Sequence, residues 1–141
     1  MNCPYNKEEH MLLNLTDLSS EPLQQQIIRQ IRAKILTGEL PSGQDLPSIR
    51  ALARENRVSV ITVQRAYEEL VRGELIHSRR GKGFFVSELP RTRKEDIARQ
   101  RIAEQLAPII HQAIADGLAP ETITGIVRTI LEKTTTSHPE E

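Results

Sequence analysis

The sequence predicts a mostly α-helical fold with one small β-hairpin. Apolar residues recur at helical spacing in five segments, and serine, threonine or proline stands at the start of each. Two short runs of β-type residues flank a glycine-rich basic turn, which predicts the hairpin. The 141 residues are enough for one domain or for two small ones.

The first predicted helix follows Pro22, which is tolerated there because a helix start does not need its missing N–H. Before it, His10–Leu15 predicts a short lead-in strand. After it, Gly38 is expected to stop the helix, and the proline and glycine breakers in residues 39–47 predict a loop. The apolar stripe of this helix consists of Leu23, Ile27, Ile28, Ile31 and Ile35.

Ser48 and Ser59 are each expected to cap a helix, because a serine hydroxyl accepts a hydrogen bond from the first helical turn. Gly73 ends the second of these helices, and the hairpin follows. A helix, a short turn, a second helix and a hairpin are the order of a winged helix-turn-helix. The helices span 48–56 and 59–72, the strands span 75–79 and 83–87, and the inward residues of the second helix are Val63, Ala66, Tyr67, Leu70 and Val71.

A long helix and a shorter one are predicted beyond Pro90. Thr92 and Glu95 fit a capping box, and the helix that they open is expected to run to about Asp116 with a kink or break at Pro108. Gly117 then stops this helix, Pro120 starts the last one, and residues 134–141 form a frayed tail.

These two helices make a segment of about 50 residues that could hardly bury enough apolar surface on its own. A second copy would cover their apolar stripes in an isologous dimer; packing onto the N-terminal part of the same chain is the alternative. We expect a winged helix-turn-helix domain at residues 1–89 and a helical dimerisation domain with a disordered tail at residues 90–141. The expected dimerisation residues are Ile102, Leu106, Ile109, Ile110, Ile114, Ile123, Ile126, Val127 and Ile130.

The charges are unevenly distributed, although the whole chain balances at 19 basic and 19 acidic residues. Residues 47–87 carry 8 basic and 4 acidic side chains, a net of +4. Residues 1–46 carry 4 and 6, and residues 88–141 carry 7 and 9, so each flank has a net of −2. A basic middle segment is typical of a nucleic-acid footprint, although chance clustering on a solvated face gives the same pattern.

Several classes of function are disfavoured. Cys3 is the single cysteine, which leaves no internal disulfide or thiolate cluster. The histidines lack metal-ligand spacing and no nucleophile–base set is present, so we expect no metal, no cofactor and no enzyme. No apolar run approaches a membrane span and the first residues do not resemble a signal peptide, so we expect a cytoplasmic protein.

The helix after Ser59 presents groups that can contact DNA at its N-terminal, exposed face. A recognition helix enters the major groove with its N-terminal residues against the base edges. Glutamine suits adenine, arginine suits guanine or phosphate, and a threonine or isoleucine methyl suits the thymine methyl. Arg50, in the first turn of the preceding helix, could reach phosphate or a base edge, although each of these residues alone is also common on ordinary surfaces.

The stretch RRGKGFF at residues 79–85 could be a phosphate loop or the tip of a hairpin. A nucleotide-binding loop needs a helix after its last glycine, and here the strand-like run FFV follows. The hairpin remains, because glycines at 81 and 83 permit positive φ and a narrow tip. The basic residues would then lie along DNA backbone or minor groove, and one of the two phenylalanines would anchor the returning strand.

Three motifs together resemble the GntR family of bacterial transcription regulators. They are LPSIRALA, VSVITVQRAYEEL and LIHSRRGKGFFV, and with the helix before them the match runs from about Pro22 to Val86. The short tail containing ADGLAPETITGIVRTILE looks like the YtrA subfamily, in which the tail is chiefly a dimerisation element. The resemblance implies DNA contacts at Arg50, at Ser59 to Thr62 and Gln64, and on the wing around Gly81. Members often have polar residues where this chain has Val60 and Ile61, so its preferred operator bases are expected to differ.

The sequence therefore predicts a homodimeric transcriptional regulator, most often a repressor in this family, that binds an inverted-repeat operator in double-stranded DNA. A regulator that senses a ligand or metal in a pocket between the C-terminal helices, with an unidentified small-molecule effector, is the alternative. A winged-helix adaptor that binds protein and has no DNA affinity is a further one. The candidate DNA-binding residues are Arg50, Ser59, Val60, Ile61, Thr62, Gln64, Arg65, Arg79, Arg80, Gly81, Lys82 and Gly83.

Overall fold

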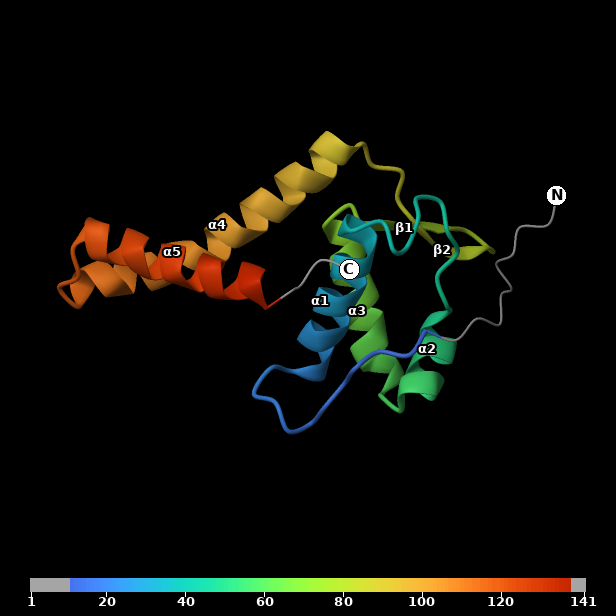
Figure 1. Ribbon diagram of the computed structural model, residues 1–141. Helices are drawn as coiled ribbons and strands as arrows, with labels where there is room; N and C mark the ends of the chain where they lie inside the picture. Colours follow the sequence, from blue (N-terminus) through green and yellow to red (C-terminus); the bar gives the residue numbers. More distant parts are fainter. Residues whose placement is uncertain (1–10, 138–141) are drawn as a thin grey trace. The chain divides into compact units, whose positions relative to one another are not determined.

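The computed structural model describes residues 11–137. The chain divides into two compact units, one up to Glu95 and the other from Asp96 onward. The first unit contains three helices and a two-stranded hairpin, and the second contains most of a long helix followed by a shorter one (Figure 1), which confirms the predicted fold class. The elements are α1 (Leu23–Leu36), α2 (Ile49–Asn56), α3 (Val60–Arg72), β1 (Ile76–Arg79), β2 (Gly83–Val86), α4 (Arg91–Ala115) and α5 (Pro120–Thr136).

Helix α3 is at the centre of the first unit. It packs against α1 and α2, and β1 lies next to it (Figure 1). Burying each large apolar side chain stabilises the fold by about 1.5–3 kcal/mol, so this core firmly fixes which face of α3 points outward. Fully buried apolar residues of the core are Ile27, Ile28, Ile31, Ile35, Leu52, Val63, Ala66, Tyr67, Leu70, Ile76 and Val86.

The outward edge of β2 is covered by the loop before α2. The Leu46 N–H donates to the Phe84 carbonyl and the Val86 N–H donates to the Gln44 carbonyl, each at 2.9 Å. Asp45 forms an isolated antiparallel bridge with β2 as a result. The sequence predicted only a loop here, because the glycine and prolines around this bridge mask the pairing.

The lead-in segment, residues 11–16, has no regular secondary structure, so the predicted strand at His10–Leu15 is wrong over the described residues; His10 lies outside them. The amide side chains of Gln26, Gln30 and Asn56 satisfy its backbone groups in place of a neighbouring strand. Their partners are Thr16 N and O for Gln26, Asn14 N and O for Gln30, and Leu13 N and Met11 O for Asn56, all at 2.8–3.0 Å.

Helix α4 departs from its predicted start and break. It begins at Arg91, so Thr92 is not the cap; the Pro90 carbonyl instead accepts from the N–H groups of Arg93 and Lys94 at 3.0 and 3.1 Å. The helix also runs through Pro108 without a break. Pro108 removes a single N–H, and both it and Glu104 are exposed, so water can satisfy the freed carbonyl.

Three further expectations about side chains and the tail need correction. Val71 is 40% exposed and not inward, because it lies at the edge of the α3 stripe. Residues Thr134 to Thr136 belong to α5, with their hydroxyls bonded to carbonyls one turn back at 2.7–2.9 Å. No residue of α4 or α5 is buried, so the stripes that were expected to point inward are at most partly covered within a single chain.

Candidate nucleic-acid interface

The N-terminus of α3 is capped as predicted. The Ser59 hydroxyl accepts from the Thr62 N–H at 3.1 Å, and the Ser59 and Thr62 hydroxyl oxygens are 2.7 Å apart. The cap satisfies one first-turn N–H. The N–H groups of Val60 and Ile61 have no partner inside the helix, as at any helix start, and they suit a backbone phosphate.

The outer face of α3 carries the residues that the sequence placed there. Val60 is 44% exposed and Ile61 is 60% exposed. Gln64 and Arg65 are also exposed, whereas Thr62 is half-buried. At about 100° per residue, Ile61 lies almost opposite the buried stripe, at the outermost line of the helix.

Glu68 lies on the same face and was not singled out from the sequence. Its Oε1 accepts from the Gln64 Nε2 at 3.2 Å, which orients the glutamine amide. The spacing of four residues between a glutamine and a glutamate was the available signal. A carboxylate repels phosphate, so Glu68 limits the DNA-compatible part of this face to the first turns of α3.

Tyr67 connects the three parts of the surface. Its hydroxyl donates to the Pro47 carbonyl at 2.7 Å, in the loop that leads into α2. Its ring meets Phe84 of β2 in a T-shaped contact, with centroids 4.9 Å apart. Tyr67 thus fastens α3 to the start of α2 and to the wing, where sequence reasoning saw only a core residue.

The first turn of α2 presents Arg50. The Ser48 hydroxyl accepts from the Ala51 N–H at 3.1 Å, which confirms the predicted cap. Arg50 is exposed in the turn that this cap fixes. Because Tyr67 holds the Pro47 carbonyl next to the cap, the position of Arg50 is tied to that of α3.

The wing is the hairpin of β1 and β2 with its basic tip. Its strands pair antiparallel, with Arg79 opposite Gly83 at the tip end. Gly81 and Gly83 have φ of 76° and 95°, a conformation that other residues adopt only with strain. All five residues of the tip, Arg79, Arg80, Gly81, Lys82 and Gly83, are exposed.

The two phenylalanines of the wing have different roles. Phe84 faces Tyr67 and anchors the strand, as one of them was expected to do. Phe85 points to the other face, where it stacks on His77 at 5.9 Å. The guanidinium carbon of Arg79 lies 4.9 Å from the Phe85 centroid, a cation–π distance that holds this arginine along the wing.

The basic residues of this surface are not neutralised by carboxylates. Among the described residues, Arg50, Arg65, Arg79, Arg80 and Lys82 take part in no ion pair. The ion pairs lie elsewhere: Glu21, for example, binds Arg29 at 2.9 Å and raises the pKa of its guanidinium. The five cations are therefore available to an external anion.

The second unit carries the residues expected at a dimer contact. They lie on α4 and α5, and their exposure ranges up to 65% at Ile109 and 57% at Ile130. Leu106, Ile110 and Ile123 are half-buried. The structure therefore places the predicted set on two helices whose apolar sides face out of the single chain.

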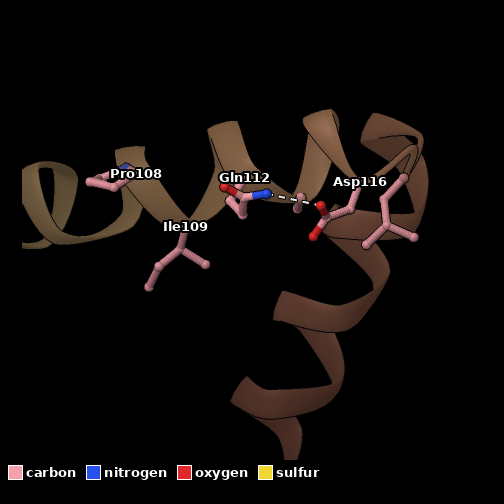
Figure 2. Close-up of a pocket in the computed structure, with 6 residues that line it drawn as sticks. Pro108, Ile109, Gln112 and Asp116 are labelled. Atoms are coloured by element: carbon pink, nitrogen blue, oxygen red, sulfur yellow. Dashed lines mark hydrogen bonds between the residues drawn. The ribbon is translucent and has the colours of Figure 1, made fainter.

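A hollow of about 470 Å³ lies near the end of α4 (Figure 2). Its walls are mainly apolar, with one polar pair in which the Gln112 Nε2 donates to Asp116 Oδ1 at 2.9 Å. The residues that line the hollow are Pro108, Ile109, Gln112, Ala113, Asp116 and Leu118.

Across residues 11–137, no three His, Cys, Asp or Glu side chains gather in a way that could hold a metal ion. Within the same part of the chain, no helix has both the length and the apolarity to cross a membrane.

Known proteins share both the sequence and the fold. The family described as "Bacterial regulatory proteins, gntR family" matches residues 23–86. The HTH-type transcriptional repressor YtrA of Bacillus subtilis is 34% identical over 112 residues, which is 79% of this chain and 86% of that protein. This match is longer than the family region and therefore includes part of the C-terminal helices.

Two solved structures extend the likeness. A GntR family transcriptional regulator from Listeria monocytogenes superimposes with a TM-score of 0.65 at 31% identity, over 82% of this chain and 98% of that one. YtrA from Sulfolobus acidocaldarius, a GntR-family transcription factor, gives a TM-score of 0.55 at 33% identity, over 67% of this chain and 97% of that one. The chain belongs to the GntR family of bacterial regulatory proteins, and it resembles the YtrA members of that family.

Proposed function

We propose that this GntR-family transcription regulator is a cytoplasmic repressor that binds an inverted-repeat operator as a homodimer. The observation that carries the proposal is the junction at Tyr67. It joins the start of α2, the recognition helix and the wing into one surface through the bond to Pro47 and the contact with Phe84. That surface carries exposed cations without carboxylate partners, which suits a polyanion.

Helix α3 is the part that reads bases. Gln64, with its amide oriented by Glu68, matches the donor and acceptor edge of adenine, and Arg65 matches guanine or phosphate. Val60 and Ile61 offer apolar contact at the first turn. Ser59 and Thr62, with the helix N-terminus, hold a backbone phosphate. Arg50 reaches a phosphate or a base edge beside them.

The wing supplies affinity and little base preference. Arg79, Arg80 and Lys82 project from a tip that Gly81 and Gly83 keep narrow. Such a tip fits along the DNA backbone or in the minor groove, where the high density of phosphate attracts its cations. The contact of Arg79 with Phe85 reduces the side-chain entropy that this arginine would lose on binding.

The homodimer rests on the second unit. Its two helices bury no residue within one chain, and they pack little against each other. Exposed apolar surface of this extent favours association, and the same pair from a second copy is self-complementary. We assign residues 1–89 to DNA binding and residues 90–141 to dimerisation, with a contact formed by Ile102, Leu106, Ile109, Ile110, Ile114, Ile123, Ile126, Val127 and Ile130.

Selection of duplex DNA from a random pool by the purified protein tests the DNA part. We expect an inverted repeat with half-sites about one helical turn apart or somewhat more. Light scattering after gel filtration tests the dimer. A monomer at micromolar concentration, or a selected pool without any shared sequence, would contradict the proposal.

A small-molecule effector is the second candidate function, favoured by the hollow near the end of α4. The hollow is open to solvent, so a ligand would rest on its mainly apolar floor with one side exposed. A ligand that binds only the folded protein raises its unfolding temperature. We expect such a shift from one class of compound in a thermal screen, and no shift in an Ala113→Trp variant, whose indole fills the hollow.

A further inference from the structure

We propose that Ile61 determines specificity by contacting the C5-methyl group of a thymine in each operator half-site. This inference rests on the proposed function, because it requires α3 to lie in the major groove. It adds a defined chemical target for one side chain.

The position of Ile61 is the first argument. It is 60% exposed at the second residue of α3, on the line almost opposite the buried stripe. A side chain there points away from the core and toward whatever α3 docks against. Val60, at 44% exposed, extends the same apolar surface by one residue.

The chemistry of Ile61 is the second argument. A β-branched residue has a lower helix propensity than alanine, leucine or glutamate, so Ile61 is not explained by helix stability. Its side chain has no polar atom, so it cannot recognise the hydrogen-bond donors or acceptors on a base edge. In the major groove, the thymine methyl is the apolar group that a base presents, and it separates A·T from the other pairs.

Glu68 is the third argument, because it restricts how α3 can dock. It lies two turns after Ile61 on the same outward line and holds the Gln64 amide at 3.2 Å. Its carboxylate would be repelled by phosphates if the whole helix lay flat along the groove. If α3 enters the major groove with its N-terminus first, Glu68 stays away from the phosphates and Ile61 lies deepest in the groove, beside Gln64. Ile61 and Gln64 then suit the edges of a neighbouring thymine and adenine.

Replacement of thymine by deoxyuridine tests the inference, because it removes only the methyl group. The probe is the duplex selected by the purified full-length protein, with each thymine replaced in turn in both half-sites. Burial of one methyl group corresponds to about fourfold in affinity, so two half-sites together give about fifteenfold. We expect this loss at one symmetric thymine position and little change at the others.

Protein variants identify the side chain. Ile61→Ser should bind the thymine and deoxyuridine duplexes equally at that position, and Ile61→Val should keep a reduced preference. Val71→Ser is the matched control, because it removes an exposed apolar side chain from the last turn of the same helix. It should keep the full preference. Circular dichroism should show all three variants folded, since both positions are exposed.

Each outcome has a clear consequence. If the native protein binds every deoxyuridine duplex as tightly as the thymine duplex, the inference is wrong while the proposed function stands. The same holds if Ile61→Ser retains the preference. If the native protein binds no duplex DNA at low salt, the proposed function fails, and this inference fails with it.

Discussion

Removal of the Tyr67 hydroxyl is the most direct test of how the interface is held together. Tyr67→Phe keeps the ring, and with it the T-shaped contact to Phe84, but deletes the donor that lies 2.7 Å from the Pro47 carbonyl. Tyr67 is fully buried and the Pro47 carbonyl is partly buried, so water replaces the lost bond poorly. We expect the variant to lose about 1–2 kcal/mol of unfolding free energy.

Chemical denaturation at a fixed protein concentration measures this loss, because the unfolding of a dimer depends on concentration. Thr37→Ala is the matched control: its hydroxyl bonds the Ala33 carbonyl at 2.8 Å but is exposed. It should change stability by less than about 0.5 kcal/mol. A Tyr67→Phe variant as stable as the native chain would refute the assigned role of this bond.

Operator affinity provides a second readout for the same variant. The Pro47 carbonyl adjoins the Ser48 cap of α2, so freeing it loosens the turn that carries Arg50. We expect a several-fold weaker complex from the added cost of ordering this turn. A loss of stability with no loss of affinity would show that Arg50 is positioned without Tyr67.

Three further variants test the surface. Arg50→Ala should cost about 1–3 kcal/mol of operator binding in a gel shift and leave the dimer intact, whereas Arg128→Ala, on α5, should change neither. Lys82→Glu should weaken binding to every sequence and reduce the salt slope, by about one unit per lost phosphate contact; an effect at a single base would contradict a wing role. Phe85→Leu should weaken binding by about 0.5–1 kcal/mol through Arg79, and should have no effect in an Arg79→Ala background if the stack is the cause.

Features set by local chemistry could be predicted from the sequence. Ser48 and Ser59 cap helices because each hydroxyl reaches an N–H three residues away. The positive φ at Gly81 and Gly83 likewise follows from the tight tip. The start of α4 was missed because two local signals compete there: Pro90 supplies the accepting carbonyl two residues before the Thr92 capping box could act.

Features that join distant residues could not be predicted in this way. The Tyr67 hydroxyl and the Pro47 carbonyl are 20 residues apart in the chain, and a tyrosine at a stripe position gives no sign of its partner. The same holds for the Asn56 amide, which bonds to Met11 from 45 residues away. Periodicity predicted which residues form the apolar stripes of α4 and α5. It does not predict which surface packs against these stripes.

The proposed function divides affinity and specificity between separate parts of this surface. The wing tip carries three cations and two glycines, which attract phosphate at any sequence. The first turn of α3 carries Val60 and Ile61, which add no charge and can distinguish bases only by their methyl groups. Salt screens the first contribution and leaves the second largely intact, because burial of a methyl group does not depend on charge. The base preference of this regulator should therefore persist at salt concentrations at which its overall affinity has already fallen.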